Sequence, residues 1–529
     1  MQELDAGKLS VRQKLGMCMI GHIRYWEGMD FTEDNEYALN LIREHALGAV
    51  WVDRYHKDLA GVMKKIREIA DYPILIMTDA ENGIGDYLIG MHNAIGCTDN
   101  EDLARAFGRV TAISARKMGY NTVCNPVLDM TTFNAACGIT MRSLGGDKYR
   151  VSRLAVAEAR GMHEGGVLSV AKHFPGILGD GSIDSHMAEV EALESREELL
   201  DYHLYPYLQL MKENLLDGIM TMHSRVPKVD PDYPASLSKK VIGLIREQGF
   251  EGVALTDALV MMGVAAKFGA QACKPLAIAN GNDLALMWGE NKESYEALLD
   301  GWEKGVIPEE RLDEAVRRVL EMQHKPLELP VDQEITPEDE EKIDRINRES
   351  TCARCDKGLL PAIDQEKLHY FVVLAENSLA IDSKGKIDVD TWDKGWYRPG
   401  EIVKRLGKLF PGSFVQVIHE FPTPSQIKRA LEDSVSYDDV VFVTFINSQA
   451  YVGREALTAR VVSLIQALQV SGRIAALVHY GNPFVLEELE HIPRVLMGGV
   501  SAENVLHTLD ILAGKEEARG VPAYEIHLK

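Results

Sequence analysis

The first three fifths of the chain alternate short apolar runs with longer amphipathic stretches, and this alternation limits the possible folds more than any other feature. Each run is nearly continuous in Val, Ile, Leu, Met and Ala, as strands buried on both faces of a parallel sheet require. The eight runs are Gly16–Ile20, Gly48–Val52, Pro73–Met77, Asn121–Cys124, Val167–Ala171, Gly218–Thr221, Gly252–Leu255 and Asp283–Met287. Eight strands separated by helix-length segments predict an α/β fold that begins with a (β/α)8 barrel of the TIM type.

The segments between the runs have the spacing of amphipathic helices. Asn35–His45 and Leu59–Ala70 carry apolar residues three and four positions apart, and Lys148–Glu164 does the same until Gly165 and Gly166 end it. We therefore predict helices on the outside of the barrel.

Charged side chains collect where the apolar runs stop. They are Asp79 and Glu81 after the third run, Lys172 and His173 after the fifth, His223 after the sixth and Asp257 after the seventh. In a barrel of this kind the residues at the carboxyl ends of the strands face the active site, so we predict the site at this rim. His223 is left out of the predicted site, because a histidine at a buried strand end can satisfy its ring nitrogens on backbone carbonyl groups.

One loop beyond the fifth run has the composition of a functional loop. Residues 171–186 read AKHFPGILGDGSIDSH, so a basic pair is followed by a glycine-rich stretch that ends on Asp184, Ser185 and His186. Such a loop can bring a carboxylate and an imidazole over a pocket, although Asp184 and His186 also suit an ordinary polar turn.

The chain changes character after Pro326. The stretch from His324 to Lys342 is acidic and contains prolines, and Thr336 before Pro337 is typical of a helix start. Further apolar runs then alternate with helical patterns. The runs are His369–Leu374, Phe414–Ile418, Asp439–Phe445 and Ile474–Val478, and the helical patterns are Glu401–Leu409, Ser425–Leu431 and Arg454–Leu468.

This change of pattern predicts three parts along the chain. We expect a catalytic barrel at residues 1–325, a linker and connecting helix at 326–350, and a doubly wound α/β sandwich domain at 351–529.

Charge and cysteine content bear on partners and compartment. The net charge of −23 disfavours nucleic acid as a partner, because phosphate binding needs clustered Lys and Arg. No signal-peptide pattern or membrane-length apolar run is present, so we expect a cytoplasmic protein with no membrane partner.

The seven cysteines suit reduced thiols, and Cys352 and Cys355 have metal spacing but no further ligands nearby. We predict no metal and no cofactor; the sequence does not give the oligomeric state.

Several motifs stand in a fixed order along the first part of the chain. They are NPVLDM, MRSLGGDKYR, AKHFPG with DSH, GIMTMHSRVPKVD and the stretch from PASLSKK to LTDALVMMGV. With them the chain, from about Leu9 to Leu320, resembles the β-N-acetylglucosaminidase branch of glycoside hydrolase family 3, in its two-domain form. HYGNPF and GVPAYEI resemble the family's α/β sandwich domain more weakly.

The resemblance implies a retaining double displacement, with Asp257 as the nucleophile. It implies that His186 is the acid/base and that Asp184 fixes the tautomer of its ring. An imidazole is neutral when it takes a proton, so it adds no second negative charge beside the nucleophile.

The resemblance also implies a set of sugar-binding residues. They are Asp79, Arg142, Lys172 and His173. Two of them have structural alternatives: Arg142 can form a surface salt bridge, and Lys172 can pair with a neighbouring strand-end acid.

Three departures from the family pattern bear on specificity. Residues 177–180 replace a His-Gly-Asp stretch and lengthen the loop by one residue, residues 82–86 replace a Gly-Gly-Arg stretch, and Ala258 replaces a second aspartate. We expect catalysis to survive the change at Ala258, whereas the first change weakens the predicted reach of His186 and the second weakens the prediction of N-acetylglucosamine as the sugar.

These features predict an enzyme that binds a small carbohydrate, an amino-sugar glycoside. It would be an exo-β-N-acetylhexosaminidase that removes terminal β-linked N-acetylglucosamine from cell-wall or chitin-type fragments, as in peptidoglycan recycling. The alternatives are a β-glucosidase-like hydrolase or a β-N-acetylglucosaminide phosphorylase on the same scaffold, and a sugar-binding protein without turnover.

Overall fold

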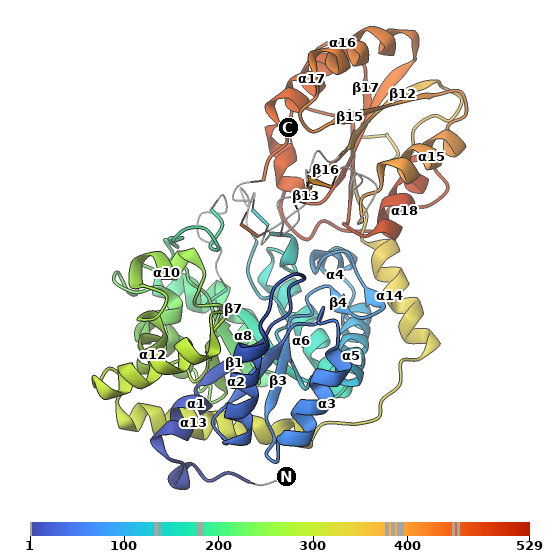
Figure 1. The fold of residues 1–529 in the computed structure, drawn as a ribbon. Helices are drawn as coiled ribbons and strands as arrows, with labels where there is room; N and C mark the ends of the chain where they lie inside the picture. Colours follow the sequence, from blue (N-terminus) through green and yellow to red (C-terminus); the bar gives the residue numbers. More distant parts are fainter. Residues whose placement is uncertain are drawn as a thin grey trace. The chain divides into compact units, whose positions relative to one another are not determined.

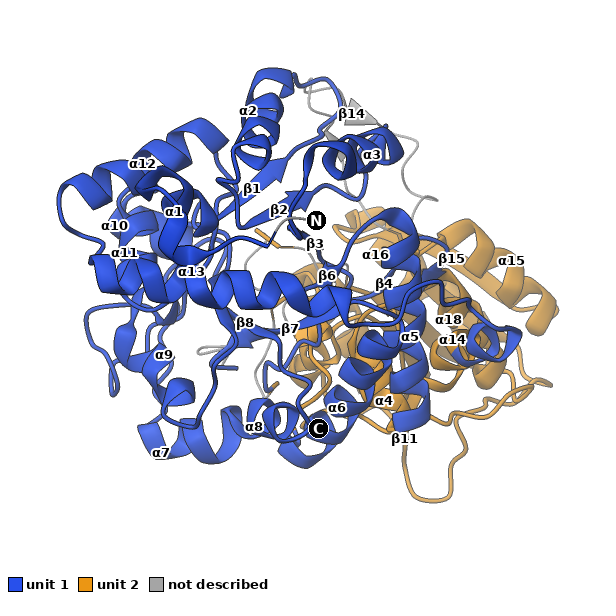
Figure 2. Ribbon diagram, turned by 90° about the horizontal axis from the view of Figure 1, so that it is seen from below, with its two compact units in different colours: residues 1–88, 101–130, 147–342 blue, residues 89–100, 131–146, 343–529 orange. Residues whose placement is uncertain are grey.

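The computed structural model of the chain describes residues 3–131, 137–138, 140–176, 183–375, 380–381, 387–388, 396–446, 450–451 and 455–528 (Figure 1). The chain divides into two compact units (Figure 2). Unit 1 consists of Met1–Leu88, Glu101–Met130 and Asp147–Lys342, and unit 2 of Ile89–Asn100, Thr131–Gly146 and Ile343–Lys529.

The strands of unit 1 form a parallel barrel. Their order is β10-β1-β2-β3-β6-β7-β8-β9, every neighbouring pair is parallel, and a bridge between Leu255 and Leu284 joins the two ends of the sheet. The strands are β1 (Met19–Ile23), β2 (Ala49–Val52), β3 (Leu75–Thr78), β6 (Thr122–Val123), β7 (Leu168–Phe174), β8 (Gly218–Thr221), β9 (Val253–Thr256) and β10 (Ala285–Leu286). The predicted (β/α)8 barrel is confirmed.

Two strand predictions need correction. The first run was placed at Gly16–Ile20, but Gly16 and Met17 end the helix α1 (Val11–Met17), and β1 begins at Met19. Hydrophobicity alone does not separate them, because the last turn of this helix is as buried as the strand that follows it. The fifth strand continues through Lys172 and His173 to Phe174, so these two residues lie within β7.

Helices cover the outside of the barrel, as Figure 2 shows for α2, α3 and α12. The helices of the first half are α2 (Thr32–Arg43), α3 (Leu59–Ile69), α5 (Glu101–Met118), α6 (Lys148–Glu164) and α8 (Tyr205–Lys212). Those of the second half are α9 (Lys239–Arg246), α10 (Met262–Phe268), α11 (Cys273–Ala279), α12 (Asn291–Glu303) and α13 (Glu309–His324). One apolar cluster combines side chains from strands all around the ring, among them Ile20, Trp51, Met77 and Leu255, which is the filled interior of such a barrel.

The helix predicted to start after Thr336 is present as α14 (Pro337–Glu349). Thr336 and Asp339 cap its start reciprocally, because the Asp339 N–H donates to Thr336 Oγ1 and the Thr336 N–H donates to Asp339 Oδ2.

Unit 2 contains a six-stranded sheet of order β11-β18-β17-β16-β12-β15, in which only β11 is antiparallel. Its strands are β11 (Cys352–Cys355), β12 (His369–Ala375), β15 (Phe414–His419), β16 (Asp439–Phe445), β17 (Ile474–Tyr480) and β18 (Arg494–Gly498), and its larger helices are α15 (Pro399–Leu409), α16 (Pro424–Asp433), α17 (Ala459–Val470) and α18 (Ala502–Leu512). The predicted doubly wound α/β architecture is confirmed. Of the helix expected at Arg454–Leu468, Arg454 lies outside the described residues, and the helix begins at Ala459, because Thr458 is extended and donates its hydroxyl to the Glu420 carbonyl.

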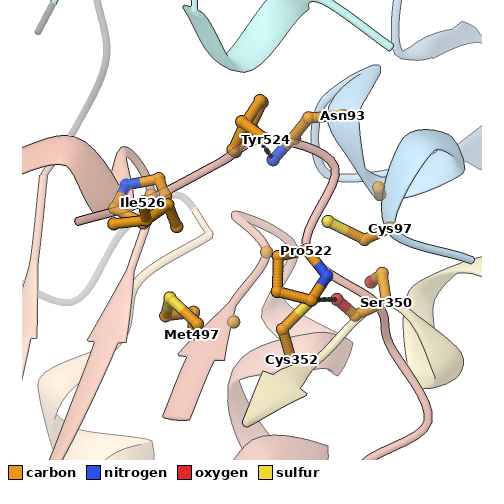
Figure 3. Close-up of a pocket in the computed structure, with 13 residues that line it drawn as sticks. Asn93, Cys97, Ser350, Cys352, Met497, Pro522, Tyr524 and Ile526 are labelled. Atoms are coloured by element: carbon orange, nitrogen blue, oxygen red, sulfur yellow. Dashed lines mark hydrogen bonds between the residues drawn. The ribbon is translucent and has the colours of Figure 1, made fainter. Parts of the chain in front are cut away.

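A narrow cavity within unit 2 is lined by residues from the α4 segment (Asn93–Thr98), from β11 and from the end of the chain (Figure 3). Tyr524 Oη accepts a hydrogen bond from Asn93 Nδ2 at 2.6 Å, so the end of the chain is tied to α4. Cys352 is buried here, and Cys355 on the same strand is partly exposed. Within the described ranges, none of the helices has both the length and the apolarity needed to cross a bilayer.

Candidate active site

Asp257 lies directly after β9, at the carboxyl end of the barrel. Its Oδ2 is 3.9 Å from His173 Nε2, and its Oδ1 accepts the Ala258 N–H at 2.7 Å. Burial raises the pKa of Asp257, but positive charge on His173, His223 and His186 together with the Ala258 N–H outweighs burial and leaves that pKa below its ordinary value. The carboxylate is therefore held ionised at neutral pH.

His173 is fixed from behind by a buried carboxylate. Its Nδ1 lies 2.6 Å from Asp129 Oδ2, and its backbone N–H donates to Asp129 Oδ1 at 3.4 Å. With Nδ1 committed to Asp129, Nε2 is the nitrogen directed toward Asp257. The pair sets both the position of the ring and its tautomer.

Lys172 is buried, with 1% of its side chain exposed, and it joins two carboxylates. Its Nζ lies 2.5 Å from Asp79 Oδ1 and 2.5 Å from Glu81 Oε1. The pairing with strand-end acids that we considered as the alternative for Lys172 is thus present. Asp79 is 40% exposed, so it also offers polar atoms to the outside of the cluster.

Asp184 and His186 form a pair across one intervening residue. Asp184 Oδ1 accepts the backbone N–H of His186 at 2.9 Å and lies 2.7 Å from His186 Nδ1. Residues 177–180, where the loop departs from the family pattern, lie outside the described residues.

The segment that carries His186 is attached beside Asp257. The backbone N–H of Met262, at the start of α10, donates to the His186 carbonyl at 3.1 Å. A Cβ at Gly263 would lie 2.6 Å from the Ser185 carbonyl oxygen, so the loop packs directly on this helix. The structure thus brings His186 and Asp257 together on neighbouring segments, with His186 close enough to affect the pKa of Asp257.

Both ring nitrogens of His223 have a hydrogen-bond partner. Its Nδ1 lies 2.8 Å from Ser236 Oγ and its Nε2 lies 3.0 Å from the Ala258 carbonyl, and burial lowers the pKa of His223. The expectation that this histidine satisfies itself on a backbone carbonyl is confirmed.

Arg142 belongs to unit 2, where it ends the short helix Thr140–Arg142. Its carbonyl lies 3.0 Å from His92 Nδ1. The predicted contact of Arg142 with sugar stays a prediction.

Sequence reasoning did not select Asp129 as a site residue. Asp129 follows Val127 and Leu128 in the NPVLDM motif, five residues past the end of the fourth apolar run, and that position is the signal that could have identified it. It is fully buried against His173, so its place is at the site.

The cluster as a whole suits polyhydroxylated ligands. Carboxylates and rigid donors face one another at the strand ends, where they can orient hydroxyl groups, and an ionised carboxylate stands beside two histidines. Among the described residues, no group of three or more His, Cys, Asp or Glu side chains is arranged to hold a metal ion.

Comparisons with known proteins agree with this chemistry. The model of the glycosyl hydrolase family 3 N-terminal domain matches residues 10–322. Beta-hexosaminidase LpqI of Mycobacterium tuberculosis is 33% identical over 272 residues, which cover 47% of this chain and 68% of that protein. A beta-hexosaminidase of Pseudomonas aeruginosa is 34% identical over 265 residues, covering 48% of this chain and 77% of that protein. The structure of a glycoside hydrolase family 3 beta-N-acetylglucosaminidase from Paenibacillus matches with a TM-score of 0.79 and 25% identity, covering 98% of this chain and 100% of that one.

Proposed function

Because this chain belongs to glycosyl hydrolase family 3, we propose that it is a retaining exo-β-N-acetylhexosaminidase, a glycoside hydrolase that removes a terminal β-linked N-acetylglucosamine. Two relatives named beta-hexosaminidase and a solved beta-N-acetylglucosaminidase support this activity. The observation that carries the proposal is the ionised Asp257 beside His173 and within the electrostatic reach of His186.

In the first step, Asp257 attacks the anomeric carbon. The bond from the carboxylate oxygen to that carbon forms while the glycosidic bond breaks, and its electron pair goes to the leaving oxygen. A depressed pKa suits this role, because only the ionised carboxylate is a nucleophile. The end of a barrel strand holds the carboxylate rigidly in place.

His186 supplies and recovers the proton. The imidazolium protonates the leaving oxygen, and the neutral ring then takes a proton from the water that releases the sugar from Asp257. Asp184 accepts from Nδ1, so Nε2 is the nitrogen that we propose to exchange the proton. Asp184 also stabilises the charged ring.

The remaining polar residues hold the terminal sugar. Asp79 accepts from sugar hydroxyls, while Lys172 and His173 act as donors whose positions are fixed by Glu81 and Asp129. We keep Arg142 as a further proposed donor. We also propose that the substrate is a cell-wall or chitin-type fragment and that the enzyme is cytoplasmic.

Chromogenic glycosides test the reaction directly. We expect release of nitrophenol from the β-N-acetylglucosaminide in preference to the β-glucoside, without acceleration by phosphate, and with the β-anomer as the first sugar product by NMR. Preference for glucose overturns the sugar assignment. A sugar 1-phosphate product shows a phosphorylase instead, and an α-anomer as the first product overturns retention.

The acid role has its own test. His186→Ala should lower kcat/KM for a methyl glycoside by roughly 10²- to 10⁴-fold while leaving kcat/KM for an activated dinitrophenyl glycoside much less affected. Azide should restore turnover and yield the β-glycosyl azide. Equal losses on both substrates count against His186 as the acid.

A further inference from the structure

The strand order of the barrel divides its carboxyl rim into two arcs. From Asp79, directly after β3, the ring passes through β6, β7 and β8 to Asp257, directly after β9, and all predicted polar site residues of unit 1 lie on this side. We call Asp79, Lys172, His173 and Asp257 the polar arc. The other side, from β9 through β10, β1 and β2 back to β3, carries aromatic side chains in the segments that follow its strands.

Trp288 is the first aromatic residue past the nucleophile strand. It follows β10, its indole stacks on the His22 ring with centroids 5.4 Å apart, and it packs on the Trp51 ring in a T-shaped arrangement with centroids 6.0 Å apart. Trp51 belongs to the apolar interior of the barrel, so Trp288 lies over that interior at the mouth. It is 38% exposed and offers ring surface there.

Tyr25 continues the arc on the loop after β1. The Asp53 carboxylate accepts a hydrogen bond from the Tyr25 N–H at 2.8 Å and lies 2.7 Å from His22 Nε2. This one carboxylate therefore positions both the backbone at Tyr25 and the ring of His22. The Tyr25 ring lies 5.2 Å from the His56 ring.

Tyr55 ends the arc next to Asp79. The Arg54 guanidinium lies 5.0 Å from the Tyr55 ring centre and donates to the Asp79 carbonyl at 3.2 Å. Tyr55 is 76% exposed. The aromatic arc of Trp288, Tyr25 and Tyr55 thus spans the rim from the nucleophile strand to the strand of Asp79.

We propose that the aromatic arc binds the leaving-group side of the substrate and that the group bound there is a second pyranose ring. This inference rests on the proposed function, which gives the polar arc to the terminal sugar. A pyranose has an apolar C–H face that packs on an aromatic ring, and hydroxyl edges that suit nearby polar groups. The arc has both parts, since Arg54 and the His22–Asp53 pair lie among its rings.

Two unactivated substrates separate the arcs. Both carry the same terminal sugar: N,N′-diacetylchitobiose has a sugar as its leaving group, and methyl β-N-acetylglucosaminide has only methanol. For Trp288→Leu we expect kcat/KM on the disaccharide to fall about 5- to 10-fold and kcat/KM on the methyl glycoside to change less than about twofold. Trp288→Phe, which keeps a ring, should retain most of the disaccharide activity.

A surface tyrosine provides the matched control. Tyr149 on α6 is exposed and packs against Tyr205 on the outside of the barrel, so Tyr149→Leu should leave both rates unchanged, whereas Tyr25→Leu should lower the disaccharide rate selectively. Equal losses on both substrates in Trp288→Leu place the indole at the terminal sugar and overturn the inference.

Failure of the proposed function is distinguishable from failure of this inference. If the wild-type enzyme cleaves neither glycoside, the proposed function fails, and the arc is tested by tryptophan fluorescence with the disaccharide and with N-acetylglucosamine. Tighter binding of the disaccharide that is lost in Trp288→Leu supports the inference. Equal binding of the two sugars overturns it.

Discussion

The two arcs of the barrel rim differ in how their side chains are held. In the polar arc, charged groups are buried and joined to charged neighbours, as Lys172 is to Asp79 and Glu81. In the aromatic arc, the partly exposed Trp288 ring rests on the buried rings of His22 and Trp51, and the Tyr55 ring is exposed. Moving one partner of a buried ion pair away from the other leaves a buried charge uncompensated, which is strongly unfavourable. A partly exposed ring can shift with little change in free energy. A rigid half suits one sugar and its reacting atoms, and an adaptable half suits varied leaving groups.

The largest expected effect comes from removing the nucleophile of the polar arc. Asp257→Ala should lower kcat/KM by roughly 10⁴-fold or more on every substrate, because no other group can form the glycosyl-enzyme intermediate. Azide should restore part of the turnover and yield the α-glycosyl azide, measured by NMR. A variant that keeps a tenth of its activity without azide contradicts this role.

The next effect tests whether the polar arc depends on its buried pairs. Asp129→Asn should lower kcat/KM by roughly 10²-fold, because an amide no longer dictates the position and tautomer of His173, and small displacements at a reacting centre are costly. Activity should be measured per folded enzyme, after thermal melting.

Asp217 provides a matched control for this experiment. It is also buried and lies 2.6 Å from a histidine, His163, but it accepts the Ser169 N–H at the opposite end of β7. Asp217→Asn should lower the melting temperature while kcat/KM stays within about threefold of wild type. Equal losses of kcat/KM in both variants show that His173 needs no positioning by Asp129.

The polar arc could be predicted from the sequence and the aromatic arc could not. Asp257, Lys172 and Asp79 interrupt or follow apolar runs, and a charge at the end of a buried strand has few explanations other than a site. Tyr25, Tyr55 and Trp288 lie far apart along the chain in loops, where aromatic residues are ordinary. Only the closure of the ring, which sets β10 between β9 and β1, shows that they share one side of the mouth.

The sequence likewise did not fix the segment that carries His186. Its contact with α10 depends on the backbone of Met262 and on the absence of a side chain at Gly263, and a lone glycine in a helical stretch does not reveal what packs on it.

Gly263 permits a smaller test, of the segment that carries His186, and this test changes no charged group. A Cβ at this position would lie 2.6 Å from the Ser185 carbonyl and 3.0 Å from the Ala188 carbonyl, so Gly263→Ala should displace the segment that carries His186. We expect a loss of roughly tenfold in kcat/KM for the methyl glycoside and a smaller loss for the dinitrophenyl glycoside, which needs less acid assistance.

Gly243→Ala is the control for the added methyl group. Gly243 lies in α9, and its Cβ would meet nothing closer than the Glu247 carboxylate at 4.0 Å. This variant should keep wild-type kinetics. Wild-type kinetics in Gly263→Ala as well show that the segment of His186 does not depend on its packing against α10.

The smallest expected effect is a shift in pH dependence that separates the arcs by charge. Burial raises the pKa of Asp257, and His173 makes the largest contribution to lowering it. The nucleophile works ionised, so a lowered pKa keeps the enzyme active at more acidic pH. Because charge on His173 favours the ionised form of Asp257, the Asp257 carboxylate likewise stabilises the folded state above the unfolded carboxyl pKa of about 3.9, and this stabilisation is lost as the pH falls through the lower folded value.

His173→Gln removes that charge, so the pKa of Asp257 should rise and the acidic limb of kcat/KM for the dinitrophenyl glycoside should move up by about one pH unit. Trp288→Leu changes no charge and should leave the same limb in place. The two pH profiles together decide whether the arcs are independent. If the acidic limb of kcat/KM moves in both variants, the aromatic arc controls access of water to Asp257. The division of the rim into a charged half and an adaptable half is then wrong.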